Sequence, residues 1–281
     1  MEIKPIDAPL GAEVVGVDLT ESLSEAEIMA VRKAFADYSL LVVRGQDLEG
    51  ADQDRFVQYL GPLERFDNGA YHQFMTNRNV ENAAGDGGGR LLFHNDGAYR
   101  ARPRSGTSLY AIDVSSTSAP TLFASGVRAY ELLSDEMRAK VEELHAVNIL
   151  DYDDPTQESR RVREADFPQG RTLADVRHAV HPVVLTLPHS GRKTLFVSEF
   201  YTSHLVEFGP HSDEGEAVLQ ELFEVLYDAS NTSSHHYANG DLVVWDNYAA
   251  QHARSAAVDS STRHLRRLVL SSLSWDAPDL G

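Results

Sequence analysis

The sequence contains no cysteine, and this absence excludes disulfides, thiolate zinc sites and cysteine nucleophiles. It also lacks any apolar run of roughly 18 residues, the length that a membrane-spanning helix needs. Positive charge is scarce, because 25 Lys and Arg residues stand against 43 Asp and Glu residues and leave a net charge of −18. Such a charge opposes binding to nucleic acids and to anionic membranes, so an anionic substrate would need a local cluster of Arg or Lys.

The composition of the whole chain is typical of a globular protein, with 42% apolar and 24% charged residues over 281 positions. The N-terminal segment MEIKPIDAPLGAEVVGVDL has neither the basic start nor the apolar core of a secretory signal. We therefore expect a cytoplasmic protein that has no nucleic-acid or membrane partner. We also expect a homo-oligomer, either a dimer or a tetramer.

The hydrophobic periodicity predicts many strands and few helices. Helices are expected near 134–145 and 213–227, at 52–61, and at 24–37, where Ser24 and Glu27 can form a capping box. Strands are expected at 39–45, 107–114, 120–125, 181–198, 240–247 and 264–275.

The predicted strands do not alternate with helices as they would in βαβ units. This favours a mainly β fold, a sandwich or jelly roll with flanking helices. We expect a single domain over residues 1–281. Residues 65–89 are expected to be irregular. The long polar connection at 151–180 is a candidate lid insertion.

Residues 90–100, RLLFHNDGAYR, place a histidine and an aspartate two positions apart in an otherwise apolar run. Chance gives about two His-x-acid triplets in a chain with 12 His and 43 acidic residues, and two occur. The second opens a predicted helix, where Ser212 can act as the cap and Asp213 suits the first turn. The first has no such explanation. At the end of a strand, His94 and Asp96 would point to one face, where a metal ion would satisfy both.

A third ligand is expected from another strand, and His252 follows the strand predicted at 240–247. Two histidines and one carboxylate leave three positions of a metal open, which favours Fe(II) and oxygen chemistry over structural zinc. Arg267 comes fifteen residues later. A strand returning antiparallel beside the one that ends near His252 would bring Arg267 to the metal cavity. A buried Arg–Asp pair and a surface arginine are the alternative interpretations of Arg267.

Seven segments occur in order along the chain: PLGAEVVGVDL, LLVVRGQDL, FHNDGAYR, PTLFASGVRAYELLS, HPVVLTLPHSGRKTLFVSEFYT, GDLVVWDNYAAQHARSAA and RHLRRLVL. Together they resemble the taurine dioxygenase-like branch of the Fe(II)/2-oxoglutarate-dependent oxygenases, which includes the 2,4-dichlorophenoxyacetate dioxygenases. The resemblance extends from about residue 5 to residue 275. It implies a double-stranded β-helix (jelly roll) core.

By position, the resemblance implies that His94, Asp96 and His252 are the iron ligands. It implies that Thr121 and Arg267 hold the distal carboxylate of 2-oxoglutarate, and that Arg263 is a second basic residue near this cosubstrate. Two positions depart from the usual pattern of the family: Phe93 replaces a frequent Trp, and Ser198 replaces a usual Asn. Neither departure affects a ligand.

The implied reaction consumes 2-oxoglutarate and O2 at Fe(II), releases succinate and CO2, and oxidises a C–H bond of a small organic substrate. Hydroxylation is favoured over halogenation, because related halogenases have Gly or Ala in place of this aspartate and bind chloride there, whereas this chain keeps Asp96. Desaturation or other oxidative tailoring of a natural-product intermediate is the alternative. A zinc hydrolase, which would need no 2-oxoglutarate anchor, and a non-catalytic binding protein also stay open.

The sequence does not identify the substrate. Candidate substrate contacts are Phe66, Tyr71, His72, Arg90 and Tyr201. Arg90 could meet a carboxylate or sulfonate, or could be a surface residue of a Gly-rich loop, whereas the aromatic residues could line an apolar pocket. Cleavage of sulfonates, sulfate esters or aryloxy acids and natural-product tailoring are both compatible with these residues.

Overall fold

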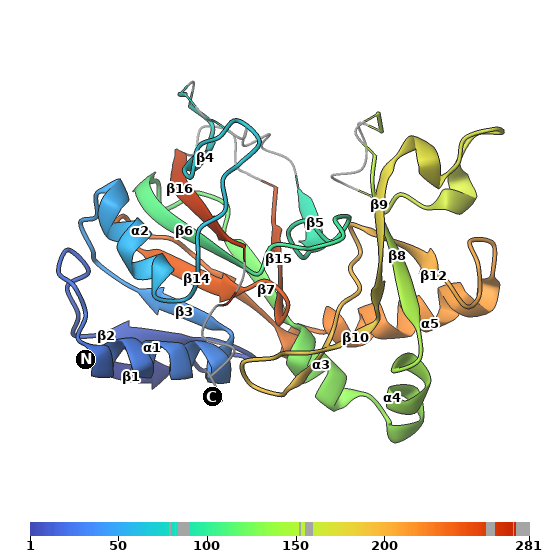
Figure 1. The fold of residues 1–281 in the computed structure, drawn as a ribbon, viewed down its shortest axis with the longest axis horizontal. Coiled ribbons are helices and arrows are strands. Elements are labelled where there is room, and N and C mark those ends of the chain that lie inside the picture. Colours follow the sequence, from blue (N-terminus) through green and yellow to red (C-terminus); the bar gives the residue numbers. More distant parts are fainter. Residues whose placement is uncertain are drawn as a thin grey trace, which may run out of the picture.

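The computed structural model describes residues 1–78, 80–81, 83, 90–151, 153–154, 160–256, 262–271 and 273. Within this part of the chain the fold is mainly β with flanking helices (Figure 1). The helices are α1 (Glu25–Tyr38), α2 (Gly50–Gln58), α3 (Gly126–Leu132), α4 (Asp135–Val141) and α5 (Asp213–Leu226). Short 3-10 turns occur at Glu164–Asp166, Leu173–Asp175 and Ala229–Asn231.

The largest sheet has seven strands in the order β1-β2-β3-β14-β6-β16-β4, and only the pairing of β2 with β3 is parallel. Its strands are β1 (Glu2–Pro5), β2 (Ala12–Val15), β3 (Leu40–Val43), β14 (Leu242–Asp246), β6 (Gly106–Val114), β16 (Arg263–Leu270) and β4 (Gln73–Thr76). A four-stranded antiparallel sheet has the order β13-β7-β15-β5. Its strands are β13 (Thr232–His235), β7 (Thr121–Ser125), β15 (Ala250–Arg254) and β5 (Leu91–His94).

These two sheets share a buried core. Trp245 of β14, with 0% of its surface exposed, meets Phe123 of β7 edge to face at a centroid distance of 5.3 Å. Apolar residues of β3, β6 and β16 join the same cluster from the larger sheet, and Ala250 of β15 joins it from the smaller one. The space between the sheets is therefore closed by aromatic and aliphatic side chains, except where polar residues open a cavity.

A second part of the molecule carries a three-stranded sheet of β12 (Thr202–Leu205), β8 (His145–Leu150) and β9 (Arg177–Pro182), and the hairpin of β10 (Val184–Thr186) and β11 (Lys193–Leu195). Residues 160–176 lie against β8: Val162 is 4% exposed and packs with Val147 and Ile149. Arg161 also pairs with Glu216 of α5. The described part of the 151–180 segment is thus anchored, and its role as a lid stays a prediction.

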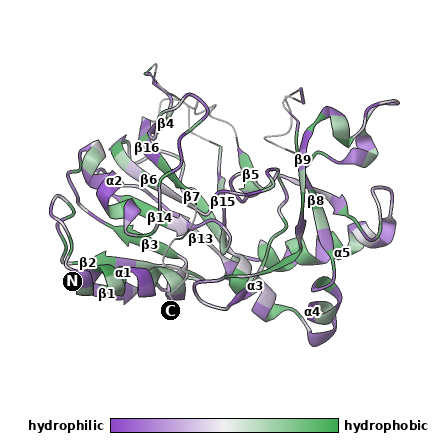
Figure 2. Ribbon diagram, viewed as in Figure 1, coloured by the Kyte–Doolittle hydropathy of each residue, from purple (hydrophilic) through white to green (hydrophobic). Residues whose placement is uncertain are grey.

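The helices form where capping groups precede an apolar stripe. Ser24 and Glu27 make the reciprocal hydrogen bonds of a capping box at the start of α1, which buries Val31 and Phe35. Ser212 accepts a hydrogen bond from the Gly215 amide at the start of α5. Figure 2 shows both hydrophobic and hydrophilic segments along α1 and α5, as expected for amphipathic helices that cover a core.

Some expected elements differ in the structure. Strand β4 lies within residues 65–89, which were expected to be irregular, and its partner is β16. The strand of Arg267, β16, was expected beside the strand predicted at 240–247, but β6 lies between β14 and β16 in the seven-stranded sheet. Arg267 nevertheless lines the cavity of His94 and His252, as expected. The helix predicted at 134–145 ends at Val141, and β8 begins at His145. Among the described residues, no helix has the length and apolar character required to cross a membrane.

Candidate metal centre and cosubstrate pocket

Two histidines face each other across the ladder of β5 and β15. His94, the last residue of β5, is the direct cross-strand partner of His252, and their ring centroids are 4.2 Å apart. Nδ1 of His94 lies 2.9 Å from the carbonyl oxygen of Leu92, so this nitrogen is engaged as the donor and Nε2 is left for a ligand. Strand pairing therefore brings two imidazole groups together from segments far apart in the sequence.

Asp96 lies in the turn that follows β5, because the strand ends at His94. The expectation that both residues project from one strand is therefore wrong, although the turn still returns the carboxylate to the histidines. Gly97 has a φ of +73°, and a Cβ there would lie 3.1 Å from the side chain of Arg100. A glycine suits this tight turn because it adopts positive φ without a steric penalty.

The two oxygens of the Asp96 carboxylate face different groups. Oδ1 lies 3.7 Å from Nε2 of His94 and 3.9 Å from Nε2 of His252. Oδ2 accepts hydrogen bonds from Oγ1 of Thr107 at 2.7 Å and from Nη2 of Arg267 at 2.5 Å. Burial alone would raise the pKa of the Asp96 carboxyl, but Arg267 and the two histidines hold it well below its usual range.

These groups fit a divalent metal ion. One ligand atom from each of His94, Asp96 and His252 lies within 4.8 Å of the other two. Burial and the neighbouring His94 ring lower the pKa of His252 well below its usual value, which favours the neutral imidazole that binds metals. Two imidazoles and one carboxylate on one side leave other coordination positions open, the arrangement expected for non-haem Fe(II).

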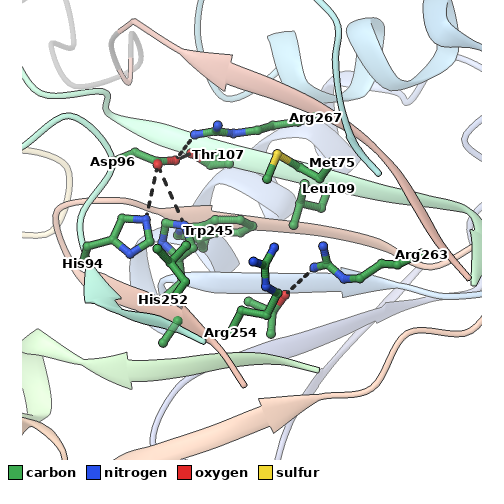
Figure 3. A pocket seen from close by; sticks show the side chains of 13 residues that line it. Met75, His94, Asp96, Thr107, Leu109, Trp245, His252, Arg254, Arg263 and Arg267 are labelled. Carbon is green, nitrogen blue, oxygen red and sulfur yellow. Dashed lines mark hydrogen bonds and ion pairs between the residues drawn. The ribbon is translucent and has the colours of Figure 1, made fainter. Parts of the chain in front are cut away.

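A cavity of about 90 Å³ begins at these three residues and extends between the two large sheets (Figure 3). Arginines from two strands line it: Arg263 and Arg267 of β16, and Arg254 of β15. Asp96 is the single acidic residue in the lining, so the described wall is strongly positive. Such a cavity is suited to a small dianion.

The positions of the two β16 arginines differ from the sequence-based expectation. Nη2 of Arg263 lies 3.4 Å from Oγ1 of Thr121, whereas Arg267 lies against Asp96 at the metal end of the cavity. The structure thus pairs Thr121 with Arg263 and not with Arg267. Tyr237 also contacts the Thr121 hydroxyl at 3.4 Å, and burial raises the pKa of its phenol to about 12.

Arg254 is a cavity residue that the sequence analysis missed. Its cross-strand partner in the register of β15 and β7 is Thr121, and it is 8% exposed. The signal was present in the sequence, because Arg254 follows His252 by two residues and side chains two apart on a strand share a face.

The five candidate substrate residues are separated in the structure. Phe66 and Tyr201 lie near the metal centre: the Phe66 ring centroid is 5.6 Å from Cζ of Arg267, and the Tyr201 ring is 5.8 Å from that of His94. Tyr71 packs on Arg65 at 4.0 Å and His72 pairs with Asp54 at 2.6 Å. Arg90 is exposed.

Sequence comparison identifies the family. The taurine catabolism dioxygenase TauD, TfdA family matches residues 2–269. The chain belongs to this family. It is 30% identical to the (S)-phenoxypropionate/alpha-ketoglutarate-dioxygenase of Sphingobium herbicidovorans over 89% of this chain and 88% of that protein. It is 28% identical to pentalenolactone F synthase of Streptomyces arenae over 96% and 95% of the two chains.

The fold agrees with this assignment. The crystal structure of AAD-2 in complex with Mn(II) and N-oxalylglycine superposes with a TM-score of 0.78 at 24% identity, covering 96% of each chain. The protein is therefore a 2-oxoglutarate-dependent dioxygenase that uses Fe(II) and O2.

Proposed function

We propose that His94, Asp96 and His252 hold the Fe(II), and that Arg263 and Thr121 hold the distal carboxylate of 2-oxoglutarate. The ligand set is supported by the convergence of the three side chains within 4.8 Å. The anchor is supported by the contact of Arg263 with Thr121 in a buried, cationic part of the cavity.

The bound metal supplies the oxidative chemistry that consumes O2 and 2-oxoglutarate. The side chains of this protein orient the reactants and exclude water. Thr107 donates to the carboxylate oxygen of Asp96 that faces away from the histidines. The guanidinium groups of Arg254 and Arg263 offer planar donors, which match a carboxylate in a way that an ammonium group does not.

We propose that the substrate is a small organic anion whose C–H bond is hydroxylated. Two guanidinium groups lie over the Phe66 ring, with Cζ of Arg104 at 4.9 Å and Cζ of Arg267 at 5.6 Å from its centroid. Burial and the charge of Arg267 lower the pKa of Arg104. A Glu64 oxygen lies 3.7 Å from Nε of Arg104 but also binds Arg100 at 2.7 Å.

Nε of Arg104 makes no hydrogen bond to any residue that the structure describes. The carboxylates in this region are thus too few for the arginines, and an anionic substrate would balance their charge. In a protein of net charge −18, this local excess of positive charge is the observation that carries the proposal. The likeness to a phenoxypropionate dioxygenase supports it, because phenoxypropionate is a carboxylate.

Oxidative tailoring of a natural-product intermediate is the second candidate, and the likeness to pentalenolactone F synthase favours it. The two candidates predict different substrates and products. Hydroxylation adds one oxygen atom to the substrate, and where the hydroxylated carbon bears an aryloxy or sulfate oxygen the adduct breaks into two fragments that together carry this added atom. Desaturation removes two hydrogen atoms. Mass spectrometry of the products therefore separates them.

The proposal predicts that the Fe(II) enzyme releases succinate only when O2 and 2-oxoglutarate are present. Succinate is measured across a panel of aryloxy carboxylates, alkyl sulfates, sulfonates and neutral lactones, with the parent and Asp96→Ala proteins. We expect turnover with an anionic member of the panel for the parent. Asp96→Ala should lose the metal and the activity, because it lacks one of only three protein ligands. Normal turnover and iron content in Asp96→Ala would contradict the ligand set, and activity that persists with Zn(II) without O2 would favour a hydrolase.

We also propose that residues 1–281 form one domain, and that the two facing sheets correspond to a double-stranded β-helix. The expected cytoplasmic location and homo-oligomeric state stay predictions. Size-exclusion chromatography with light scattering measures the number of subunits directly.

A further inference from the structure

Strand pairing explains the positions of the two histidines but not that of Asp96. The ladder between β5 and β15 joins His94 to His252, and β5 ends there. Asp96 comes two residues later, in a turn that belongs to no strand. Because a metal site requires its ligands to be held to within about 0.5 Å, other contacts must fix this turn.

The side chain of Asn247 supplies these contacts. It is fully buried, with 0% exposure, in the turn between β14 and β15. Its Oδ1 accepts a hydrogen bond from the Asp96 amide at 2.7 Å. Its Nδ2 donates to the carbonyl oxygens of Asp96 at 3.0 Å and of Arg104 at 2.7 Å. One carboxamide thus binds both polar backbone groups of Asp96.

Backbone contacts reinforce this arrangement from both sides. The amide of Asn247 donates to the carbonyl oxygen of Ser105 at 3.0 Å. In return, Nδ2 of Asn95 donates to the carbonyl oxygen of Asn247 at 2.7 Å and contacts that of Ala250 at 3.4 Å. The connection from β5 to β6, which carries Asp96, is therefore tied at both of its ends to the turn that leads into the strand of His252.

We propose that Asn247 is a positioning residue for the metal, whose carboxamide sets the distance of Asp96 from His94 and His252. This inference rests on the ligand set proposed above. Asn247 contacts the backbone of Asp96 and leaves the ligand oxygens to the metal, Thr107 and Arg267. A carboxamide is required because Asp96 presents one N–H donor and one carbonyl acceptor, and Arg104 presents a second carbonyl acceptor. An aspartate would lose the two donations, and an alanine would lose all three bonds.

The test is metal binding, measured by calorimetric titration of the metal-free protein with Mn(II), an ion found in the related AAD-2 structure. We expect Asn247→Ala to bind Mn(II) roughly 10- to 100-fold more weakly than the parent, the usual effect of removing a group that orients a metal ligand. Thermal unfolding of the metal-free proteins is measured in parallel, because Asn247→Ala also removes buried hydrogen bonds.

Asn231→Ala is the matched control. Asn231 is also fully buried, and its Nδ2 donates to the carbonyl oxygens of Ser125 at 3.0 Å and Leu226 at 2.9 Å. It contacts none of the three proposed ligands. Asn231→Ala should therefore lower the unfolding temperature, as Asn247→Ala does, yet keep the Mn(II) affinity of the parent. If Asn247→Ala does not fold, Asn95→Ala carries the same comparison, since it removes the hydrogen bonds that Asn95 makes to the opposite turn.

The outcomes separate this inference from the ligand set on which it rests. Weak binding by Asp96→Ala with parent-like binding by Asn247→Ala would overturn the positioning role alone. Parent-like binding by Asp96→Ala would instead overturn the ligand set. Equal losses of affinity in Asn247→Ala and Asn231→Ala would show that general loosening, and not the position of Asp96, weakens the site.

Discussion

Arg263 and Arg267 share one face of β16, yet they meet opposite ends of the cavity. Arg263 contacts Thr121 at 3.4 Å, and Arg267 contacts Asp96 at 2.5 Å. Truncating one partner of a buried charge pair costs about 3–5 kcal/mol. With about 1.4 kcal/mol per decade, Arg263→Ala should weaken 2-oxoglutarate binding by roughly 10²- to 10⁴-fold. Thr121→Ala removes a neutral hydroxyl and should weaken binding only about tenfold.

Anaerobic titration of 2-oxoglutarate into the Fe(II) enzyme, followed by its metal-to-ligand absorption, measures these constants. Arg267→Ala is the informative comparison, because it removes a guanidinium from the same strand face. We expect it to weaken 2-oxoglutarate binding less than Arg263→Ala does. A larger effect of Arg267→Ala together with near-parent binding by Arg263→Ala would restore the expectation drawn from the sequence and would leave Arg263 without an anchoring role.

The sequence could predict some of the residues that gather at the site, but it missed Arg254 and did not give the contacts between them. The residue pattern pointed to His94, Asp96 and His252 as candidate ligands, the family resemblance strengthened this prediction, and the three side chains do converge. The sequence alone could not show which of the two arginines, Arg263 or Arg267, lies beside Thr121. This depends on how β16 of the seven-stranded sheet faces β7 of the four-stranded sheet, which carries Thr121, and this packing brings together residues that are distant in the chain.

At the scale of elements, the opposite face of β16 holds α2 in place through a buried polar contact. Gln53 of α2 is 0% exposed, and its Oε1 accepts a hydrogen bond from Nε of Arg266 at 2.7 Å. Nη2 of Arg266 also donates to the carbonyl oxygens of Leu48 and Glu49. The strand therefore presents Arg263 and Arg267 to the cavity and Arg266 to the helix layer, as alternation along a strand requires.

Gln53→Ala should lower the free energy of unfolding by about 1–3 kcal/mol, because it leaves Nε of a buried guanidinium without its acceptor. Gln58→Ala on the exposed side of the same helix is the control and should change it by less than about 0.5 kcal/mol. Urea denaturation of the metal-free proteins measures both values. Equal stabilities of the two variants would show that the Gln53–Arg266 contact does not hold the helix to the sheet.

The elements that the sequence predicted well are those whose signals are local. The capping box of α1 and the apolar run of β3 are contained in short windows, and both elements formed as expected. Strand β4 was missed, because Gln73–Thr76 show little periodicity, with three half-buried residues followed by the buried Thr76, and the strand pairs with β16 at the far end of the chain. Its formation depends on tertiary context, which a window of sequence does not contain.

At the scale of the whole molecule, the net charge is negative, whereas arginines line the cavity next to the proposed metal ligands. The net charge of −18 opposes a dianionic cosubstrate at long range, but this field is screened beyond roughly 8 Å at physiological ionic strength. In the proposed binding mode, affinity for 2-oxoglutarate comes from the arginines that line the cavity. The need for such a cluster followed from composition alone, whereas its location required the fold.

Buried histidines give the molecule a pH-dependent stability. His181 of β9 is 9% exposed, and its Nε2 lies 2.9 Å from the carbonyl oxygen of Ala98 and 3.0 Å from that of Arg100, in the segment that follows Asp96. Burial lowers the pKa of His181 below its ordinary value of 6.5, and burial likewise lowers the pKa of His204. The unfolded chain therefore binds more protons than the folded one once the pH falls below about 6.5.

The free energy of unfolding should consequently be largest above pH 6.5 and should fall as the pH is lowered from 7 to 5, by at most about 1.4 kcal/mol per pH unit for each such histidine. His181→Gln keeps a hydrogen-bond donor near the two carbonyls but cannot take up a proton, so its stability should fall less steeply than that of the parent. His178→Gln, at an exposed position of the same strand, is the control and should keep the parent slope. Urea denaturation at a series of pH values measures the slopes, and a His181→Gln slope equal to that of the parent would exclude His181 as a source of the acid sensitivity.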